Sequence, residues 1–319
     1  MKVLVTGSCG FQGTHVTEAL LEAGDEVWGL AIPSETSIRN YYKYLEGREG
    51  YHQVWGSVND KDLVDRTIVQ VDEVFHLAAK INVDESIYDF ENFYRTNIIG
   101  TSNVLEACRK YDVPLIATST CEVMGENDSG LPMAEDRPLK PHSPYAASKC
   151  AADRMCYAYY KTHGLDVKIV RPFNLFGPRQ KSAGAGALIP ILFEKAINNE
   201  SLTIFGSGEQ DRDYLYIDDI VRAYMIIRKT DDFIGKVVHV GSGKPQRIMD
   251  IAKKIVDMVG SGDIVHKDAR PGEVRTFTAD NSLIEKYGFK PEVEFDAGLK
   301  KYRDWRTNNA RIGRMFTKT

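Results

Sequence analysis

Short apolar runs alternate with longer helical patterns along the first half of the chain. Runs that are typical of buried strands occupy Lys2–Thr6, Glu26–Leu30, Val74–Leu77, Leu115–Thr118 and Val167–Val170. Between them, apolar residues recur at helical spacing in Gly13–Ala23, Phe93–Arg109 and Tyr145–His163. Strands that alternate with helices favour a parallel sheet with helices on both faces. The pattern therefore predicts an α/β fold built on a doubly wound parallel sheet.

The rhythm changes after about residue 178. The segment Gln180–Gly186 is rich in small residues and predicts a loop, whereas Ile189–Asn198 predicts a helix. Residues typical of a strand in Arg212–Asp219 lead into a further helix, and shorter patterns follow at Ile251–Met258 and Leu283–Tyr287. We therefore expect a first domain at residues 1–178 and a smaller lobe at residues 179–319, partly interleaved with the first.

The composition narrows the classes of function. A formal net charge of -4 over 319 residues gives no basic surface of the kind that nucleic acid or an anionic membrane requires. The 5 cysteines form an odd number without paired metal-ligand spacing, which favours reduced thiols and no metal site. The chain opens directly on an apolar run, and no stretch approaches the roughly 20 apolar residues of a membrane span. We expect a cytoplasmic protein without a signal peptide that binds neither nucleic acid nor membrane.

The segment "TGSCGFQG" places Gly7, Gly10 and Gly13 between the first strand and the first helix. Glycines allow a sharp turn and a close approach to a pyrophosphate, whose charge meets the free N–H groups of the helix N-terminus. Glycines also serve ordinary strand-to-helix turns, but the position at the first such junction favours a dinucleotide cofactor. We expect this turn, with Phe11 and Gln12, to bind it.

The choice between NAD and NADP stays open at this stage. Ala31 and Ile32 follow the second strand, where an acidic residue ordinarily binds the ribose hydroxyls of NAD. Ser34, Thr36 and Arg39 offer groups for a 2'-phosphate, although Arg39 is equally compatible with a solvated surface charge.

The segment "SPYAASK" places Tyr145 and Lys149 one turn apart on the same face of a helix. An ammonium near a phenol favours the phenolate, so we expect Lys149 to lower the pKa of Tyr145. Tyr145 is then a candidate general base toward a hydroxyl that loses a hydride to nicotinamide. The competing explanation is a tyrosine on a buried helical face beside a lysine that extends to solvent.

Together these features resemble the extended short-chain dehydrogenase/reductase family, the NAD-dependent epimerases and dehydratases of nucleotide sugars. The resemblance covers nearly the whole chain and implies a Rossmann cofactor domain and a C-terminal lobe that binds a nucleoside diphosphate sugar. It also implies NAD or NADP, tightly bound and recycled, beside Ala78, Ala79, Asn97, Tyr145 and Lys149. The segments that carry it are "HLAA" (His76–Ala79), "TNIIGTSNVLEA" (Thr96–Ala107), "STCEVMG" (Ser119–Gly125), "RPFNLFGP" (Arg171–Pro178), "GSGEQDRDYLYIDD" (Gly206–Asp219) and "RPGEV" (Arg270–Val274).

By the same resemblance, Thr120 binds the reacting sugar hydroxyl beside Tyr145. Asn174 and Arg212 contact the diphosphate, and Arg270 closes over it. Arginine binds phosphate oxygens in bidentate fashion, which supports these roles independently. A salt bridge is the competing explanation for each arginine, above all for Arg212, which precedes Asp213.

The triplet Thr120–Cys121–Glu122 points to the reaction. The 4,6-dehydratases of the family have Thr-Asp-Glu, in which the Asp protonates the departing hydroxyl on carbon 6 and the Glu takes the proton from carbon 5. Glu122 is thus the candidate base, and Cys121 replaces the acid by a thiol. We expect redox-neutral dehydration through a 4-keto intermediate, by a 4,6-dehydratase or a 5,6-dehydratase variant that returns the hydride to carbon 4. Buried packing of Cys121 and a structural hydrogen bond of Glu122 are the competing explanations.

Several alternatives stay open beside dehydration. A 4-epimerase makes Glu122 incidental, and a decarboxylase of nucleotide-linked glucuronate also has the Glu but requires a cationic clamp. A non-catalytic NAD(P)-binding protein is disfavoured, because the chain keeps Thr120, Tyr145 and Lys149. Gln12 and Met124 depart from the Ile and Tyr usual in the family, and both departures fit an uncommon substrate. The helices at Phe93–Arg109 and Tyr145–His163 correspond to the dimer interface of the family, so we expect a homodimer.

Overall fold

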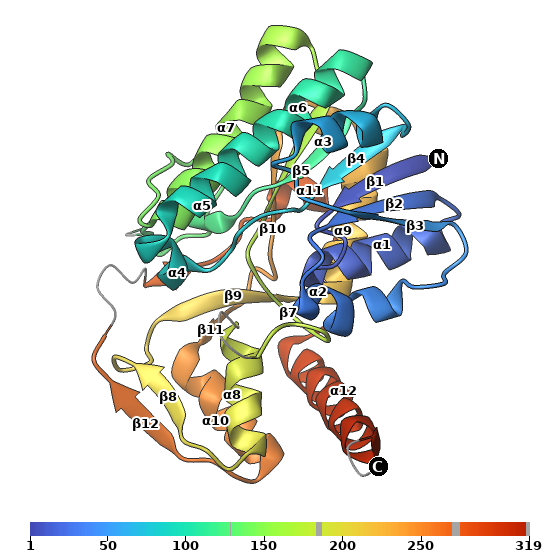
Figure 1. The fold of residues 1–319 in the computed structure, drawn as a ribbon. Helices are drawn as coiled ribbons and strands as arrows, with labels where there is room; N and C mark the ends of the chain where they lie inside the picture. The colour runs from blue at the N-terminus through green and yellow to red at the C-terminus, as the bar shows by residue number, and fades with distance from the viewer. Residues whose placement is uncertain (128, 183–186, 270–274, 317–319) are drawn as a thin grey trace.

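A computed structural model describes residues 1–127, 129–182, 187–269 and 275–316 of the chain (Figure 1). Its centre is a 7-stranded sheet with the strand order β10-β6-β5-β4-β1-β2-β3, and every neighbouring pair is parallel. The predicted doubly wound α/β fold is therefore confirmed. The strands of this sheet are β1 (Lys2–Thr6), β2 (Glu26–Ala31), β3 (Tyr51–Trp55), β4 (Glu73–His76), β5 (Leu115–Thr118), β6 (Val167–Pro172) and β10 (Val237–Val240).

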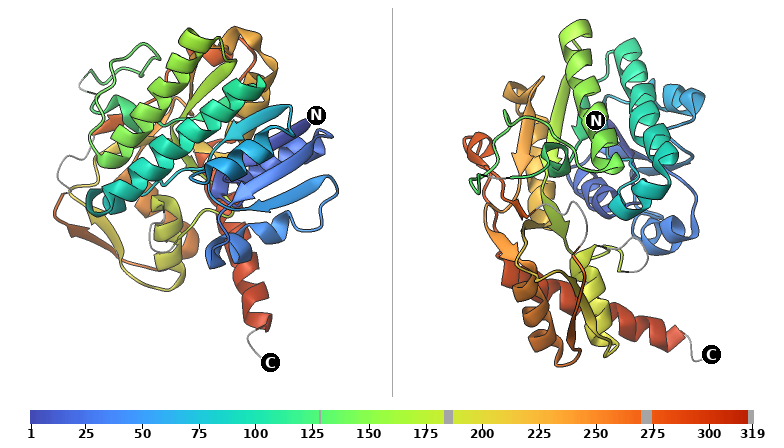
Figure 2. Two further views of the ribbon diagram at one scale, coloured as in Figure 1. Left: turned by 45° about the horizontal axis from the view of Figure 1, so that its top comes forward. Right: turned by 90° about the vertical axis from the view of Figure 1, so that its left-hand side faces the viewer.

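Alternation along the strands sends side chains to both faces of the sheet, and helices cover both (Figures 1 and 2). Val3 and Val5 pack in the core shared with the helices α1 and α9, whereas Leu4 between them packs toward α3, α6 and α7. The bounds of these helices are α1 (Phe11–Glu22), α9 (Ile217–Lys229), α3 (Lys61–Ile68), α6 (Gly100–Tyr111) and α7 (Pro144–His163).

The second half of the chain builds a smaller lobe and also returns to the main sheet. One sheet of the lobe contains β7 (Asn174–Phe176), β9 (Asp211–Tyr216), β11 (Pro245–Arg247) and β13 (Thr276–Phe277). A parallel pair, β8 (Leu202–Phe205) and β12 (Ile264–Lys267), lies beside α8 (Leu188–Ile197) and α10 (Ile248–Val259) in Figure 1. The last helix, α12 (Phe295–Phe316), points away from the body of the lobe in Figures 1 and 2. Although β10 and α9 follow residue 178, β10 belongs to the main sheet and α9 covers one of its faces. The chain thus returns to the first domain, and the division at residue 178 stays a prediction.

The helix predicted over Phe93–Arg109 is divided by a π-helical turn. α5 ends at Tyr94, the π-helical segment η2 runs from Arg95 to Ile99, and α6 follows at once. The extra residue of a π turn rotates the side chains around it, and such turns are frequent at functional sites. The shorter elements of the chain are α2 (Glu35–Asn40), η1 (Tyr42–Tyr44), α4 (Val83–Tyr88), α5 (Phe90–Tyr94), η3 (Cys121–Met124), η4 (Asp231–Phe233) and α11 (Ser282–Glu285).

No helix within the described ranges is both long enough and apolar enough to cross a membrane.

A group of buried charges fastens α9 to the amino end of the sheet. The guanidinium of Arg228 donates to Glu73 Oε2 at 2.7 Å and to Asp25 Oδ1 at 3.1 Å. The N-terminal ammonium of Met1 also lies 3.1 Å from Asp25. The side chains of Arg228, Asp25 and Glu73 are only 11%, 8% and 9% exposed, so these charges depend on one another.

Replacing Arg228 by alanine is expected to lower the free energy of unfolding by about 3 kcal/mol, because it leaves buried carboxylates short of a cation. Urea denaturation of the purified variant measures the change. Lys254→Ala is the control, since it removes an ion pair to Asp296 in which the side chains are 37% and 59% exposed. A surface pair of that kind contributes about 0.5 kcal/mol. Equal losses in the two variants would contradict the role given to Arg228.

Candidate active site

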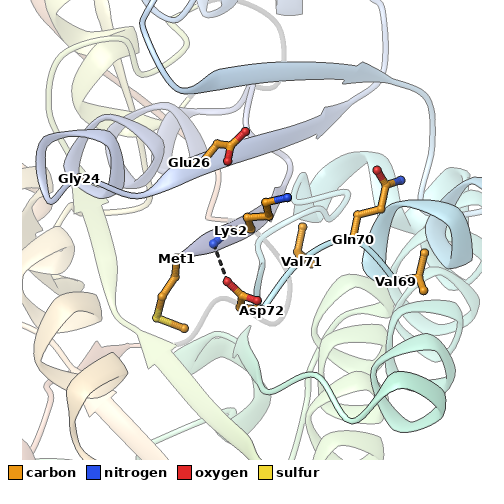
Figure 3. Close-up of a pocket in the computed structure, with 8 residues that line it drawn as sticks. All are labelled: Met1, Lys2, Gly24, Glu26, Val69, Gln70, Val71 and Asp72. Atoms are coloured by element: carbon orange, nitrogen blue, oxygen red, sulfur yellow. Dashed lines mark hydrogen bonds between the residues drawn. The ribbon is translucent and has the colours of Figure 1, made fainter.

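The predicted cofactor-binding loops and the Thr120 segment gather at the carboxyl edge of the main sheet. The glycine turn follows β1, the Leu77–Lys80 loop follows β4, and Ser119 and Thr120 follow β5. Ligands of open parallel sheets bind at this edge. A hollow of about 570 Å³ lies at the opposite edge, where Lys2 and Glu26 begin their strands (Figure 3). That hollow is remote from the glycine turn and contains none of the predicted site residues.

The glycine turn is packed too closely for any other residue type at two positions. Gly7 has a φ of +75°, and a Cβ there would lie 2.9 Å from the backbone nitrogen of Ala78. A Cβ on Gly13 would lie 2.0 Å from the carbonyl oxygen of Gly7. The turn is closed by a hydrogen bond from the Gly10 nitrogen to the Gly7 oxygen at 2.9 Å.

Helix α1 begins directly after this turn, at Phe11. Gly10 is its N-cap, without a side-chain cap, and the first turn of the helix carries no acidic residue. The N-terminal N–H groups are thus available to an anion, and no carboxylate repels it. The residues present therefore fit the pyrophosphate of a dinucleotide, as predicted for Phe11 and Gln12.

The end of β2 departs from the usual ribose site, as the sequence predicts. Ala31 is buried, and Ile32 is exposed. The hydroxyl of Ser34 caps α2 by accepting from the Ser37 nitrogen at 3.1 Å, so the helix uses one of the groups considered for a 2'-phosphate. The side chain of Arg39 lies outside the described residues.

Asn97 holds the Ala78–Lys80 loop from within the π-helical turn. Its amide accepts from the Lys80 nitrogen at 2.8 Å and donates to the Lys80 oxygen at 2.9 Å. It also donates to the Ser148 hydroxyl on α7 at 2.9 Å. Ala78 is fixed independently, because its nitrogen donates to Thr6 Oγ1 at 3.2 Å. Ala79 lies between Ala78 and Lys80, whose backbones are both held by hydrogen bonds. These bonds fix the position of the loop beside the glycine turn.

Tyr145 and Lys149 both lie on the buried face of α7, at 8% and 6% exposure. Ser143 caps the helix by accepting from the Ala146 nitrogen, and Pro144 occupies its first turn. Lys149 Nζ donates to the Thr118 oxygen at 2.6 Å. The predicted pair is thus brought to the end of β5.

The predicted lowering of the Tyr145 pKa is wrong for this structure. Burial raises the pKa of Tyr145, and the hydrogen bond with Thr120 only partly opposes it. Burial also lowers the pKa of Lys149 to about 8. Both shifts have one cause, which spacing along a helix does not reveal: each group loses water, so its neutral form is favoured.

Cys121 and Glu122 follow Thr120 in the 3-10 turn η3 but lie in different surroundings. Cys121 packs in an apolar cluster with Phe173 and Phe277, and burial holds the pKa of its thiol well above the usual range. Burial also raises the pKa of Glu122, while the charges of Arg212 and His142 lower it. The charge of Glu122 also raises the pKa of Tyr145, and the Glu122 nitrogen donates to Thr120 Oγ1 at 3.3 Å. Met124 is buried in the same cluster as Cys121.

The predicted phosphate-binding residues lie on the lobe. The Asn174 Nδ2 atom at the start of β7 is buried and makes no hydrogen bond to the part of the chain that the structure describes. The Arg212 guanidinium on β9 donates to the Asp211 oxygen at 2.7 Å and lies over the ring of Phe277, 5.3 Å from its centre. Arg270 lies outside the described residues.

The carboxylate of Asp213, the alternative partner considered for Arg212, serves the backbone. It accepts from the nitrogens of Ser242, Gly243 and Ala279 at 2.6, 2.9 and 2.9 Å. These bonds join β9 to the segments after β10 and β13.

Two sets of contacts in the site were missed by the sequence reasoning. The first joins Ser119, Asp153 and Arg171 beneath the site, and the second joins Gln12, Tyr224 and Thr118 across the sheet edge. Asp153 lies one turn after Lys149, a signal within reach of the sequence. No local pattern connects the members of the second set.

The site is that of a nicotinamide-dependent enzyme of the doubly wound class, and comparison defines the family. The model of the NAD dependent epimerase/dehydratase family matches residues 3–241. The chain therefore belongs to this family, whose members are enzymes that use NAD.

Curated relatives align over nearly the full chain. The low-salt glycan biosynthesis protein Agl12 of Haloferax volcanii is 34% identical over 310 residues, which cover 96% of this chain and 98% of the relative. A dTDP-glucose 4,6-dehydratase of Streptomyces niveus is 32% identical over 320 residues, 97% of this chain and 94% of the relative.

Solved structures of two different activities superpose about equally well. DesIV, a dTDP-glucose 4,6-dehydratase of Streptomyces venezuelae solved with NAD bound, has a TM-score of 0.92 at 31% identity, with 97% of this chain and 98% of that chain covered. A UDP-glucose 4-epimerase of Thermotoga maritima solved with UDP-glucose has a TM-score of 0.91 at 30% identity, with 97% and 100% covered. Overall similarity thus does not separate the two reactions.

Tyr145→Phe is expected to lower kcat by about 10²–10⁴-fold, because it removes the hydroxyl that takes the substrate proton. Substrate affinity, measured by calorimetry, should change little because the phenyl ring remains. Tyr159→Phe on the same helix is the matched control, since its hydroxyl bonds to Glu106 outside the site. Undiminished turnover in Tyr145→Phe would remove Tyr145 as the base.

Proposed function

We propose that the protein dehydrates a nucleoside diphosphate hexose through a 4-keto intermediate, without net oxidation. The single observation that carries this proposal is the half-buried carboxyl of Glu122 beside Tyr145. Oxidation at carbon 4 needs Tyr145 alone as its base, so a second titratable group in the same place implies a second proton transfer. Elimination from carbons 5 and 6 requires that transfer.

In the first step, Thr120 orients the carbon 4 hydroxyl and Tyr145, as the phenolate, takes its proton. Because burial favours the neutral phenol, Tyr145 must first lose its own proton to solvent before it can act as the base. The glycine turn would hold NAD, which would supply the hydride acceptor for carbon 4 and the hydride that completes the redox-neutral reaction. Lys149 is held by Thr118 on the same face of α7 as Tyr145. Its positive charge is poised to stabilise the phenolate as the proton moves.

In the second step, Glu122 takes the proton from carbon 5, which the neighbouring keto group has acidified. A raised pKa makes its carboxylate a stronger base than an exposed one. The carbon 6 hydroxyl must then leave with a proton. Cys121 is the donor implied by the family pattern, but the high pKa of its thiol makes it a weak acid. Protonated Glu122 is the stronger donor of the two, so we propose that Glu122 both takes and supplies the proton.

The site of hydride return defines the product. Return to carbon 6, with a proton from Glu122 after it has exchanged with solvent added to carbon 5, gives a 4-keto-6-deoxy sugar. Return to carbon 4, with the proton held by Tyr145 given back to the oxygen, leaves a 5,6-unsaturated sugar. In the Thr-Asp-Glu pattern, an Asp protonates the hydroxyl that leaves carbon 6. Here Cys121 occupies that position and packs among apolar side chains, so the chemistry at carbon 6 differs from that pattern. Both outcomes therefore belong to the proposal, and labelling separates them.

We also propose that Asn174, Arg212 and Arg270 bind the diphosphate. The buried, unpaired amide nitrogen of Asn174 supports this role, because a donor in that state gains most from a ligand acceptor. Epimerisation is the second candidate, supported by the similarity to the Thermotoga enzyme. Decarboxylation is less favoured, because it requires a separate cation for the substrate carboxylate.

Incubation with a panel of nucleotide hexoses and mass spectrometry tests the reaction class. Loss of water supports dehydration, loss of carbon dioxide indicates decarboxylation, and an isomer of unchanged mass indicates epimerisation. With deuterium at carbon 4 of the substrate, label at carbon 6 of the product identifies the 4,6-dehydratase. Label retained at carbon 4 of a dehydrated product identifies the 5,6-dehydratase variant.

Glu122→Gln is expected to abolish the incorporation of solvent deuterium at carbon 5, because glutamine has the same shape but cannot take the proton. NMR of the product in deuterated water measures the exchange. Glu126→Gln is the matched control, since its carboxyl accepts from the Arg275 nitrogen beyond η3. If the wild-type protein neither releases water nor exchanges carbon 5, dehydration is wrong and epimerisation becomes the better proposal. A 5,6-unsaturated product has no hydrogen at carbon 5, so the exchange test applies to the 4-keto-6-deoxy product.

We further propose a cytoplasmic homodimer. All 5 cysteines are unpaired, which fits a reducing compartment. Large apolar side chains are exposed on adjoining helices beside α7, which makes this face a candidate dimer interface. They are Val83, Ile87, Tyr88, Phe90, Tyr94, Ile99 and Tyr157.

Light scattering after gel filtration is expected to give twice the chain mass for the wild-type protein and the monomer mass for Ile87→Glu. A buried, unpaired carboxylate at the interface opposes association. Val265→Glu on β12 is the control, because Val265 is also exposed but lies on the other lobe. A monomeric wild-type protein would exclude the dimer.

A further inference from the structure

Gln12, the departure in the glycine turn, has a partner far along the chain. The hydroxyl of Tyr224 on α9 donates to Gln12 Oε1 at 3.1 Å. Tyr224 is fully buried, and its ring packs edge-on against Phe75 of β4 with centres 6.2 Å apart. A buried phenol is stabilised by hydrogen-bond partners, and an isoleucine at position 12 offers no acceptor for its proton. Gln12 and Tyr224 are therefore a matched pair.

The same hydroxyl also contacts β5, the strand whose last residue accepts a hydrogen bond from Lys149 of α7. Tyr224 Oη lies 2.7 Å from Thr118 Oγ1 at the end of β5. Because the phenol donates its one proton to Gln12, Thr118 is the donor in this second bond. The carbonyl oxygen of Thr118 accepts from Lys149 Nζ at 2.6 Å. The side chain of Thr118 is thus tied to Gln12, and its backbone is tied to Lys149.

We infer that Gln12 and Tyr224 are positioning residues that couple the cofactor-binding turn to Lys149 through Thr118. The connection crosses the carboxyl edge of the sheet from β1 to β5 and involves α1, α9 and α7. Gln12 lies in the first turn of α1, whose N–H groups fit the pyrophosphate, so a shift at either end is transmitted to the other. The catalytic part of this inference rests on the proposed function, whereas its effect on NAD binding does not.

Tyr224→Phe removes only the shared hydroxyl. We expect the dissociation constant for NAD, measured by calorimetry on protein stripped of nucleotide, to rise about 5-fold. That factor corresponds to the roughly 1 kcal/mol of a neutral hydrogen bond. We expect kcat to fall by a similar factor while KM for the nucleotide sugar is unchanged, because Asn174 and Arg212 lie outside the connection.

Gln12→Leu and the double variant complete a mutant cycle. Leucine keeps the approximate shape of the side chain and removes the acceptor. If the pair acts as one connection, the double variant should be no worse than either single variant. If the fold-changes in NAD affinity of the two single variants multiply in the double variant, the two residues act independently and the inference is overturned.

Tyr302→Phe is the matched control. Tyr302 is also a fully buried tyrosine, and its hydroxyl has no hydrogen-bond partner within the described chain. We expect the Tyr302→Phe variant to have the NAD dissociation constant and the kcat of the wild-type protein. Equal losses of NAD affinity in Tyr302→Phe and Tyr224→Phe, or no loss in Tyr224→Phe, would overturn the coupling.

The two proposals fail in different ways. If no nucleotide sugar is dehydrated but the cycle in NAD affinity is non-additive, the coupling holds and the proposed reaction is wrong. If dehydration occurs and the cycle is additive, the reaction holds and the coupling is wrong.

Discussion

The active-site helix is held to the sheet by one buried ion pair. Arg171 on β6 donates to the two oxygens of Asp153 on α7 at 2.8 and 3.1 Å, and the Ser119 hydroxyl donates to the same carboxylate at 2.6 Å. Both charged side chains are almost fully buried, and Arg154 also donates to Asp153 at 2.9 Å, so loss of Asp153 would leave Arg171 as a buried cation without its ion-pair partner. Asp153 lies on the same helical face as Tyr145 and Lys149, one turn further on. The pair therefore fixes the register of Tyr145 and Lys149 against Thr120.

Local spacing was sufficient to predict the main parts of this site. The glycine turn and the Tyr145–Lys149 pair depend on residues a few positions apart, and each strand of the parallel sheet is recognisable as a short apolar run between helical patterns. The π turn around Asn97 was missed because one extra residue shifts the helical pattern only slightly within a helix that continues on both sides. The partners of Arg171 and Tyr224 were missed because the contacts join segments that are distant in sequence.

The direction of the Tyr145 pKa shows a different limit. The spacing predicted that Lys149 lowers the pKa of Tyr145, but the outcome depends on how deeply both groups are buried, and burial is the largest cause of both shifts. The same distinction separates Cys121 from Glu122, which are adjacent in sequence. One is surrounded by aromatic and methionine side chains supplied by distant strands, and the other faces charged groups. The residue type at a motif position thus does not determine the pKa of its side chain.

The return of β10 to the main sheet has a consequence for the order in which the protein is made. β10 is the edge strand beside β6, and Arg228 joins α9 to charges on the strand ends near the N-terminus. During synthesis, the sheet remains incomplete until β10, at residues 237–240, has left the ribosome. Pairing over such long loops is slow and leaves the edge of β6 unpaired in the interval. A nascent chain released early would expose that edge, which makes truncated forms prone to aggregate rather than to fold as a separate cofactor domain.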